Sequence, residues 1–301
     1  MLPMVVAFGS GQQPYFRDDE RIVADCSAIL YGHDCVGMCR LLSFGLAFTQ
    51  STAERRDFYF MRAQFASLSC FSNLKTFIVQ FFLLPFINIL FLGAINNQYG
   101  SADDWVVSAA SILLSGMLQA MSSLVVLFVN DQNRGIDREL IARNPYSVYY
   151  WGTKIACSVA TAALLTVLNL AFLYILAWLF AGNTSVILDA LLLLPQMLLS
   201  GVALGFVTAV GGWGNSDPYR WSNWIQIAAN ALSGALIVYT QYPRVLRMLT
   251  ELFPLAHTLG ILFHVPDSGF HDFVVSVLWG AIGILIYRIK IGIVRRNKTI
   301  R

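Results

Sequence analysis

The sequence predicts an all-α membrane protein in which six helices cross the bilayer, and three observations lead to this prediction. Apolar residues make up 57% of the 301 residues. Asp, Glu, Lys and Arg make up 12%, about half the roughly 25% of an ordinary soluble domain. Six apolar segments are long enough to cross a bilayer as helices, which takes about 17–25 residues each.

The same composition excludes other classes of protein. A mean hydropathy of +0.62 is incompatible with a disordered chain, and so few charges do not cover the surface of a soluble enzyme. The net charge of +3 is too small to imply a nucleic-acid partner. The partner that the composition implies is the lipid bilayer.

The N-terminal segment, residues 1–53, mixes polar and apolar residues, and we predict for it only a place in the cytoplasm. His33, Cys35 and Cys39 lie in this segment, but zinc sites need four ligands at tighter, repeated spacing. We therefore predict free thiols and no metal site.

Residues 54–73 predict an amphipathic helix that lies on the membrane surface. Apolar residues recur there at steps of three and four, which places them on one helical face; they are Phe58, Met61, Phe65 and Leu68. Arg55, Arg56 and Arg62 give the remainder a basic side, which suits the headgroup region of a bilayer. The alternative is a packed helix of a small soluble domain.

The six predicted spans form a transmembrane domain over residues 74–292, followed by a basic cytoplasmic tail, 293–301. The spans are 74–95, 105–129, 149–180, 186–210, 221–242 and 273–289. Between spans five and six, residues 243–266 are too apolar for a solvated loop and are broken by Pro243 and Pro254. We predict a pair of short re-entrant helices there, with Glu251, Pro254 and His257 as its candidate functional residues.

The basic residues predict the orientation. Arg134, Arg138 and Arg143 follow the second span, and Lys and Arg recur in the tail, whereas residues 96–104 and 181–185 contain neither. Because cytoplasmic loops carry the excess of Lys and Arg, both termini are predicted to face the cytoplasm of a multi-pass protein in the cell membrane. Arg244 and Arg247 fall on the outer side as an exception.

Motifs of catalysis are missing from the sequence. It contains no G-x-x-x-x-G-K-[ST] phosphate loop, no H-E-x-x-H and no G-x-S-x-G. We therefore predict no catalytic residue, no bound cofactor and no ATPase activity of the chain by itself. The span centres carry no charge, and Lys154 lies near a span end, where it is expected to snorkel toward water.

Neutral polar residues inside the spans are candidates for a substrate pathway: Asn88, Gln119, Asn169 and Asn230. A role in hydrogen bonding between helices explains each of these residues as well as a pathway role does. Gly201 and Gly205 on the fourth span predict close helix packing instead of a site.

The cytoplasmic segment 130–147 is the most informative part of the chain. Gly135 permits a turn, residues 136–143 predict two turns of helix with Glu139 and Arg143 as an ion pair, and Pro145 ends that helix. A short charged helix held between two spans can transmit a push from a cytoplasmic partner. An ordinary solvated turn explains the same residues.

This segment resembles the intracellular-loop signature of the ABC type-2 permease family. The resemblance lies in Asp131, Arg134, Gly135, Arg138, Glu139, Leu140, Pro145 and Ser147. A second landmark of the family, between spans five and six, is similar to Pro254, Leu255 and His257. The chain departs from the family at residues 131–136, where Glu-Arg-Glu-x-Gly-Thr is common.

The resemblance implies the permease subunit of an ATP-driven exporter for a hydrophobic or amphipathic substrate, such as a drug, lipid, glycolipid or polysaccharide. It implies two partners, a second copy or related permease and a separate cytoplasmic ATPase subunit that binds ATP and Mg²⁺. Coupling to that ATPase falls to Arg134, Gly135, Asp137, Arg138, Glu139 and Arg143, together with Arg55, Arg56 and Arg62. The alternatives are an ion-coupled secondary transporter or channel, and a membrane scaffold that carries nothing.

Overall fold

The computed structural model describes residues 64–65, 67–68, 71, 73–83, 86–87, 104–179, 184–235, 239–265 and 269–299. The chain divides into two compact units, Met1–Thr49 and Gln50–Arg301, and every described residue belongs to the second. The predicted cytoplasmic segment and nearly all of the predicted interfacial helix, with Arg55, Arg56 and Arg62, lie outside the described residues.

Four helices are long and apolar enough to cross a membrane, and they match the second, third, fourth and sixth predicted spans. These are α7 (Asp104–Asn133), α9 (Val148–Leu179), α10 (Ser185–Gly212) and α14 (Phe270–Thr299). The described residues form helices and turns, with no strand among them. The last helix also runs on through residues 293–299, which the sequence predicted as a tail.

The first and fifth predicted spans differ from single long helices in the part that is described. The first begins as α5 (Leu74–Ile78), capped by the Asn73 side chain, and continues as the π-helix η1 (Val79–Leu83). In the fifth, α11 (Arg220–Leu232) has 13 residues, about 20 Å of helix against a hydrocarbon core of about 30 Å.

The helix α11 ends before the fifth predicted span does, because of its local backbone conformation. Gly234 has a φ of 73°, in the left-handed region, where glycine is favoured. The Ser233 hydroxyl accepts a hydrogen bond from the backbone N–H of Ala235, at 3.3 Å. Apolar composition concealed this break, because the residues after it are apolar as well.

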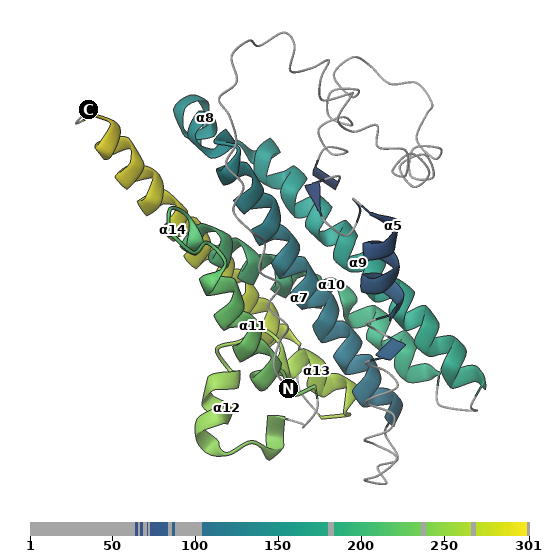
Figure 1. The fold of residues 1–301 in the computed structure, drawn as a ribbon. Coiled ribbons are helices and arrows are strands. Elements are labelled where there is room, and N and C mark those ends of the chain that lie inside the picture. Colours follow the sequence, from purple (N-terminus) through teal and green to yellow (C-terminus); the bar gives the residue numbers. More distant parts are fainter. Residues whose placement is uncertain are drawn as a thin grey trace. The chain divides into compact units, whose positions relative to one another are not determined.

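Two short helices follow between α11 and α14, in the segment for which the sequence predicted a re-entrant pair. They are α12 (Arg244–Thr250), which begins directly after Pro243, and α13 (Ala256–Leu262). A 3-10 turn, η2 (Tyr239–Gln241), precedes them. Figure 1 shows them at one end of the helix bundle, which we call the α13 end; α8 (Ile136–Arg143) and the last turns of α14 lie at the opposite end, the α8 end.

The helix α10 packs against α7, α9, α11, α13 and α14. A Cβ on Gly201 would lie 2.5 Å from the backbone oxygen of Met117, and one on Gly205 would lie 3.0 Å from the Cα of Met121. The two glycines therefore let α7 and α10 approach closely, as the sequence predicted.

Candidate functional site

The short helix α8 lies where the sequence predicted it, between two long spans. Gly135 turns the chain with a φ of 74°, and Asn144 ends the helix in an extended conformation, with φ −149° and ψ 88°. The residue before a proline avoids the helical region, which explains the end before Pro145. Asp137 and Glu139 occupy the first turn, where the helix dipole favours negative charge.

One tryptophan holds the base of α8. Trp213, directly after α10, donates a hydrogen bond from Nε1 to Oδ2 of Asp137, at 3.0 Å. Its backbone oxygen accepts a hydrogen bond from Nζ of Lys290, at 2.7 Å. The first turn of α8 is thus tied to the end of α10 and, through Trp213, to α14.

An aromatic cluster lies beneath α8. The ring centroids of Trp213 and Tyr287 are 5.8 Å apart, and those of Trp151 and Phe128 are 5.2 Å apart. The Tyr287 hydroxyl donates a hydrogen bond to the backbone oxygen of Pro145, at 2.5 Å. Trp213 and Tyr287 therefore hold the two ends of α8, and rings from α7 and α9 pack around these two residues.

A buried ion pair joins α7 and α9 near the same end. Nζ of Lys154 lies 2.7 Å from Oδ2 of Asp131, and it donates hydrogen bonds to the backbone oxygen of Leu127, at 2.9 Å, and to Gln64 Oε1, at 3.2 Å. Lys154 is 0% exposed. The expectation that it snorkels is wrong, because a carboxylate and two further oxygens replace water around the ammonium.

The other predicted coupling residues lie on or beside α8. Arg134 is exposed in the turn before the helix, and Glu139 is exposed in its first turn. Arg138 and Arg143 belong to the helix, but their side chains fall outside the description, and so does the predicted ion pair of Glu139 with Arg143.

The predicted pathway residues have separate surroundings. Gln119 Oε1 accepts from Gln80 Nε2, at 3.2 Å. Asn169 is buried and donates to the backbone oxygen of Leu165, whereas Asn230 is exposed and donates to that of Gln226. These hydrogen bonds run to different partners rather than among the three, and Asn88 lies outside the described residues.

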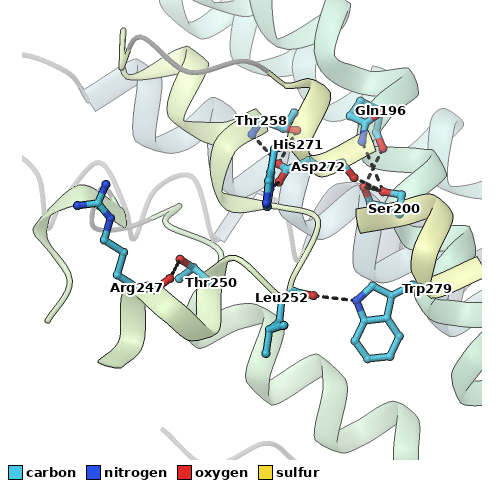
Figure 2. A network of polar contacts seen from close by, with 10 residues as sticks. Gln196, Ser200, Arg247, Thr250, Leu252, Thr258, His271, Asp272 and Trp279 are labelled. Atoms are coloured by element: carbon cyan, nitrogen blue, oxygen red, sulfur yellow. Dashed lines mark hydrogen bonds and ion pairs between the residues drawn. The ribbon is translucent and has the colours of Figure 1, made fainter. Parts of the chain in front are cut away.

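A second polar cluster lies at the α13 end, where Thr258 on α13 meets His271 and Asp272 on α14 (Figure 2). His257, also on α13, belongs to the same cluster. Asp272 Oδ2 accepts hydrogen bonds from the backbone N–H and the hydroxyl of Thr258, both at 2.7 Å. The rings of His257 and His271 are 4.4 Å apart. Burial lowers the pKa of His257 below its ordinary value, against the opposing effect of the Asp272 carboxylate.

The sequence pointed to only part of this cluster. Of the candidates in the outer segment, Pro254 is buried, His257 is half-buried in the cluster, and Glu251 is exposed after α12. Asp272 was not predicted as a site residue, because the sixth span was predicted to begin one residue later. The signal was a His-Asp pair directly before a long apolar run.

The four long apolar helices indicate a membrane-embedded protein that is all-α in the described residues. Comparisons with protein-family models, with curated proteins and with solved structures found no match. The geometry of the two ends is therefore the basis for inferring what the protein does.

Proposed function

We propose that the chain is the permease subunit of an ATP-driven exporter of the ABC type-2 kind. The observation that carries the proposal is the attachment of α8, which is hydrogen-bonded through Asp137 to Trp213. The attachment fixes the first turn of α8 against the end of α10 and, through Trp213, against α14. A helix that passes on a push from a cytoplasmic partner needs such a fixed position.

The attachment supports a mechanical coupling of α8 to the spans. A force on α8 passes through Gly135 to α7, through Pro145 to α9, and through Trp213 to α10 and α14. The ATPase subunit would bind ATP and Mg²⁺, and its closure would supply the force. Arg134, with Arg138 and Arg143 on α8, would supply positive charge toward that subunit.

The charges of the described helices support the orientation. The α8 end carries Arg134 and, on α14, Arg288, Lys290, Arg295 and Arg296. By the excess of Lys and Arg on cytoplasmic segments, this end would face the cytoplasm of the cell. The α13 end, with α12 and α13 as outer helices, would face outward.

The surface of α14 supports a place for a second copy. Only 17% of its most apolar stretch of 18 residues is buried. Such a surface meets either lipid or another subunit, and an exporter of this kind needs two permease subunits around one path. The cargo is proposed to be hydrophobic or amphipathic, with Gln119, Asn169 and Asn230 as pathway candidates.

A second candidate function is ion-coupled transport. The observation that favours it is burial of charge, since Asp131, Lys154 and Asp272 are all shielded from solvent, and ionisable residues inside a membrane are commonly functional. They lie close to the ends of their helices, however. Lys154 is only six residues, about 9 Å, into α9, far from the midplane.

Purification of the chain from its native membrane, with a search for a co-purifying ATPase, tests the proposal. We expect an ATPase subunit that the permease stimulates in proteoliposomes, and we expect Arg134→Glu with Arg138→Glu to remove that stimulation. The matched control is Arg244→Glu at the α13 end, which should leave it intact. Transport that needs no ATP but follows an ion gradient would overturn the proposal in favour of the second candidate.

A further inference from the structure

The strongest unassigned chemistry in the described residues is the cluster of His257, His271 and Asp272. Each residue offers one ligand atom, and these atoms all lie within 4.8 Å of one another. His271 Nδ1 and Asp272 Oδ1 are 3.6 Å apart, which is too long for a hydrogen bond. Two ligands of one tetrahedral metal ion lie about 3.4 Å apart when each bond is about 2.1 Å, so this pair already has a ligand spacing.

The carboxylate of Asp272 is oriented as a metal ligand would be. The side chain is 0% exposed, and both hydrogen bonds from Thr258 fall on Oδ2. Among the described residues, Oδ1 has no hydrogen-bond partner, although a buried carboxylate oxygen ordinarily has one. Hydrogen bonds that hold one carboxylate oxygen and present the other are typical of the surroundings of metal ligands.

The two imidazoles approach from different helices. His257 belongs to α13. His271 lies on the first turn of α14 beside Asp272 (Figure 2). The His271 side chain is 41% exposed, so solvent reaches the cluster. A metal ion held by the three ligands would keep a fourth position for water or another donor.

We propose that His257, His271 and Asp272 form a binding site for a divalent transition-metal ion, with Zn²⁺ as the ion that fits the donor set. Two histidine nitrogens and one carboxylate oxygen are a known set of zinc ligands. Mg²⁺ and Ca²⁺ prefer sites made of oxygen alone, and Cu(I) prefers sulfur. The bound ion would fasten α13 to the start of α14.

Metal binding by the purified full chain tests this site, and it does not depend on the proposed function or on an ATPase. We expect the metal-free protein to take up one Zn²⁺ per chain, and Co²⁺ in its place to give the visible spectrum of a site with nitrogen ligands. Zn²⁺ should raise the melting temperature of the wild type.

Three variants locate the site. His271→Ala should abolish the Co²⁺ spectrum and the Zn²⁺-dependent rise in melting temperature while preserving the fold, because this side chain is half-exposed. Thr258→Val removes one hydrogen bond to Asp272 and should weaken Zn²⁺ binding by about 10–100-fold. His264→Asn, outside the cluster, is the control and keeps a residue type that tolerates the positive φ of 56° found there.

Two results would overturn the proposal. The first is a wild-type chain that binds no Zn²⁺ after complete removal of the chelator. The second is stoichiometric binding that survives His271→Ala or is lost equally in His264→Asn. The melting temperature measured without metal shows that each variant is folded, so a loss of binding cannot be mistaken for unfolding.

Discussion

The indole of Trp213 and the carboxylate of Asp137 are separated by 76 residues in the chain and joined by a hydrogen bond of 3.0 Å. The bond matters because α8 has eight residues, and isolated helices below about 12–15 residues are marginal in water. The position and order of α8 therefore depend on its attachment to the neighbouring spans.

Trp213→Phe should loosen α8 while leaving the spans folded. The substitution keeps an aromatic ring beside Tyr287 but removes the N–H donor to Asp137. A hydrogen bond to a charged group contributes about 1.5–3 kcal/mol, and 1.4 kcal/mol is a tenfold change. Hydrogen exchange of the backbone amides in the last turn of α8 should therefore accelerate by about tenfold or more.

The control for this measurement is Trp224→Phe on α11, whose side chain is 67% exposed. It should leave exchange in α8 unchanged. Equal protection of α8 in the wild type and in Trp213→Phe would show that the Trp213 bond does not order this helix.

Asp131 and Lys154 should behave as an energetically coupled pair. Lys154→Met leaves a buried carboxylate without its cation, and Asp131→Leu leaves a buried ammonium without its anion. Each should cost about 3–5 kcal/mol of unfolding free energy, whereas the double variant should cost much less than the two together. Denaturant unfolding in detergent measures all three, and additive losses would contradict the coupling.

The elements that the sequence predicted well are those with local signals. The bounds of α8 follow from Gly135 and Pro145, which act on the backbone of their own neighbours. The four long helices follow from apolar runs that exceed the thickness of a bilayer. The packing role of Gly201 also follows from its type, because a residue without a side chain in an apolar helix marks a close contact.

The features that sequence analysis missed depend on residues distant in the chain. Lys154 is buried because Asp131 and Gln64 reach it, and nothing near Lys154 in the sequence shows this. Asp272 looks like a solvated residue at a span end until Thr258 donates two hydrogen bonds to it. The break after α11 was not predicted, because Ser233 and Gly234 stand within a segment that is otherwise mostly apolar.

Gly201→Ala should destabilise the contact between α7 and α10. The added methyl group would meet the Met117 backbone oxygen at 2.5 Å, and backbone cannot move aside as a flexible side chain does. Overpacking of this kind costs about 1–3 kcal/mol. Gly292→Ala on α14 is the control, because a Cβ there would meet no heavy atom within 4 Å apart from the backbone of its own helix. It should be neutral or stabilising by up to about 1 kcal/mol. Equal stability of the two variants would refute this role of Gly201.

Cysteine labelling should place the α8 end and the α13 end on opposite sides of the membrane. In a background with the five native cysteines replaced, Asn133→Cys tests the exposed end of α7, and Met248→Cys tests α12, where the side chain is 70% exposed. A membrane-impermeant maleimide should label Met248→Cys on intact cells, and Asn133→Cys only after permeabilisation.

This labelling pattern depends on whether the segment containing α11 crosses the membrane. Between the two labelled positions the chain passes through α9, α10 and α11, and an odd number of crossings is needed to put them on opposite sides. The 13 residues of α11 are too few to cross alone. The expected labelling pattern therefore requires the break at Gly234 to lie inside the bilayer, where neighbouring helices would have to shield its backbone. Labelling of both cysteines from one side would mean that α11 does not cross, and labelling of Asn133→Cys from outside would reverse the orientation.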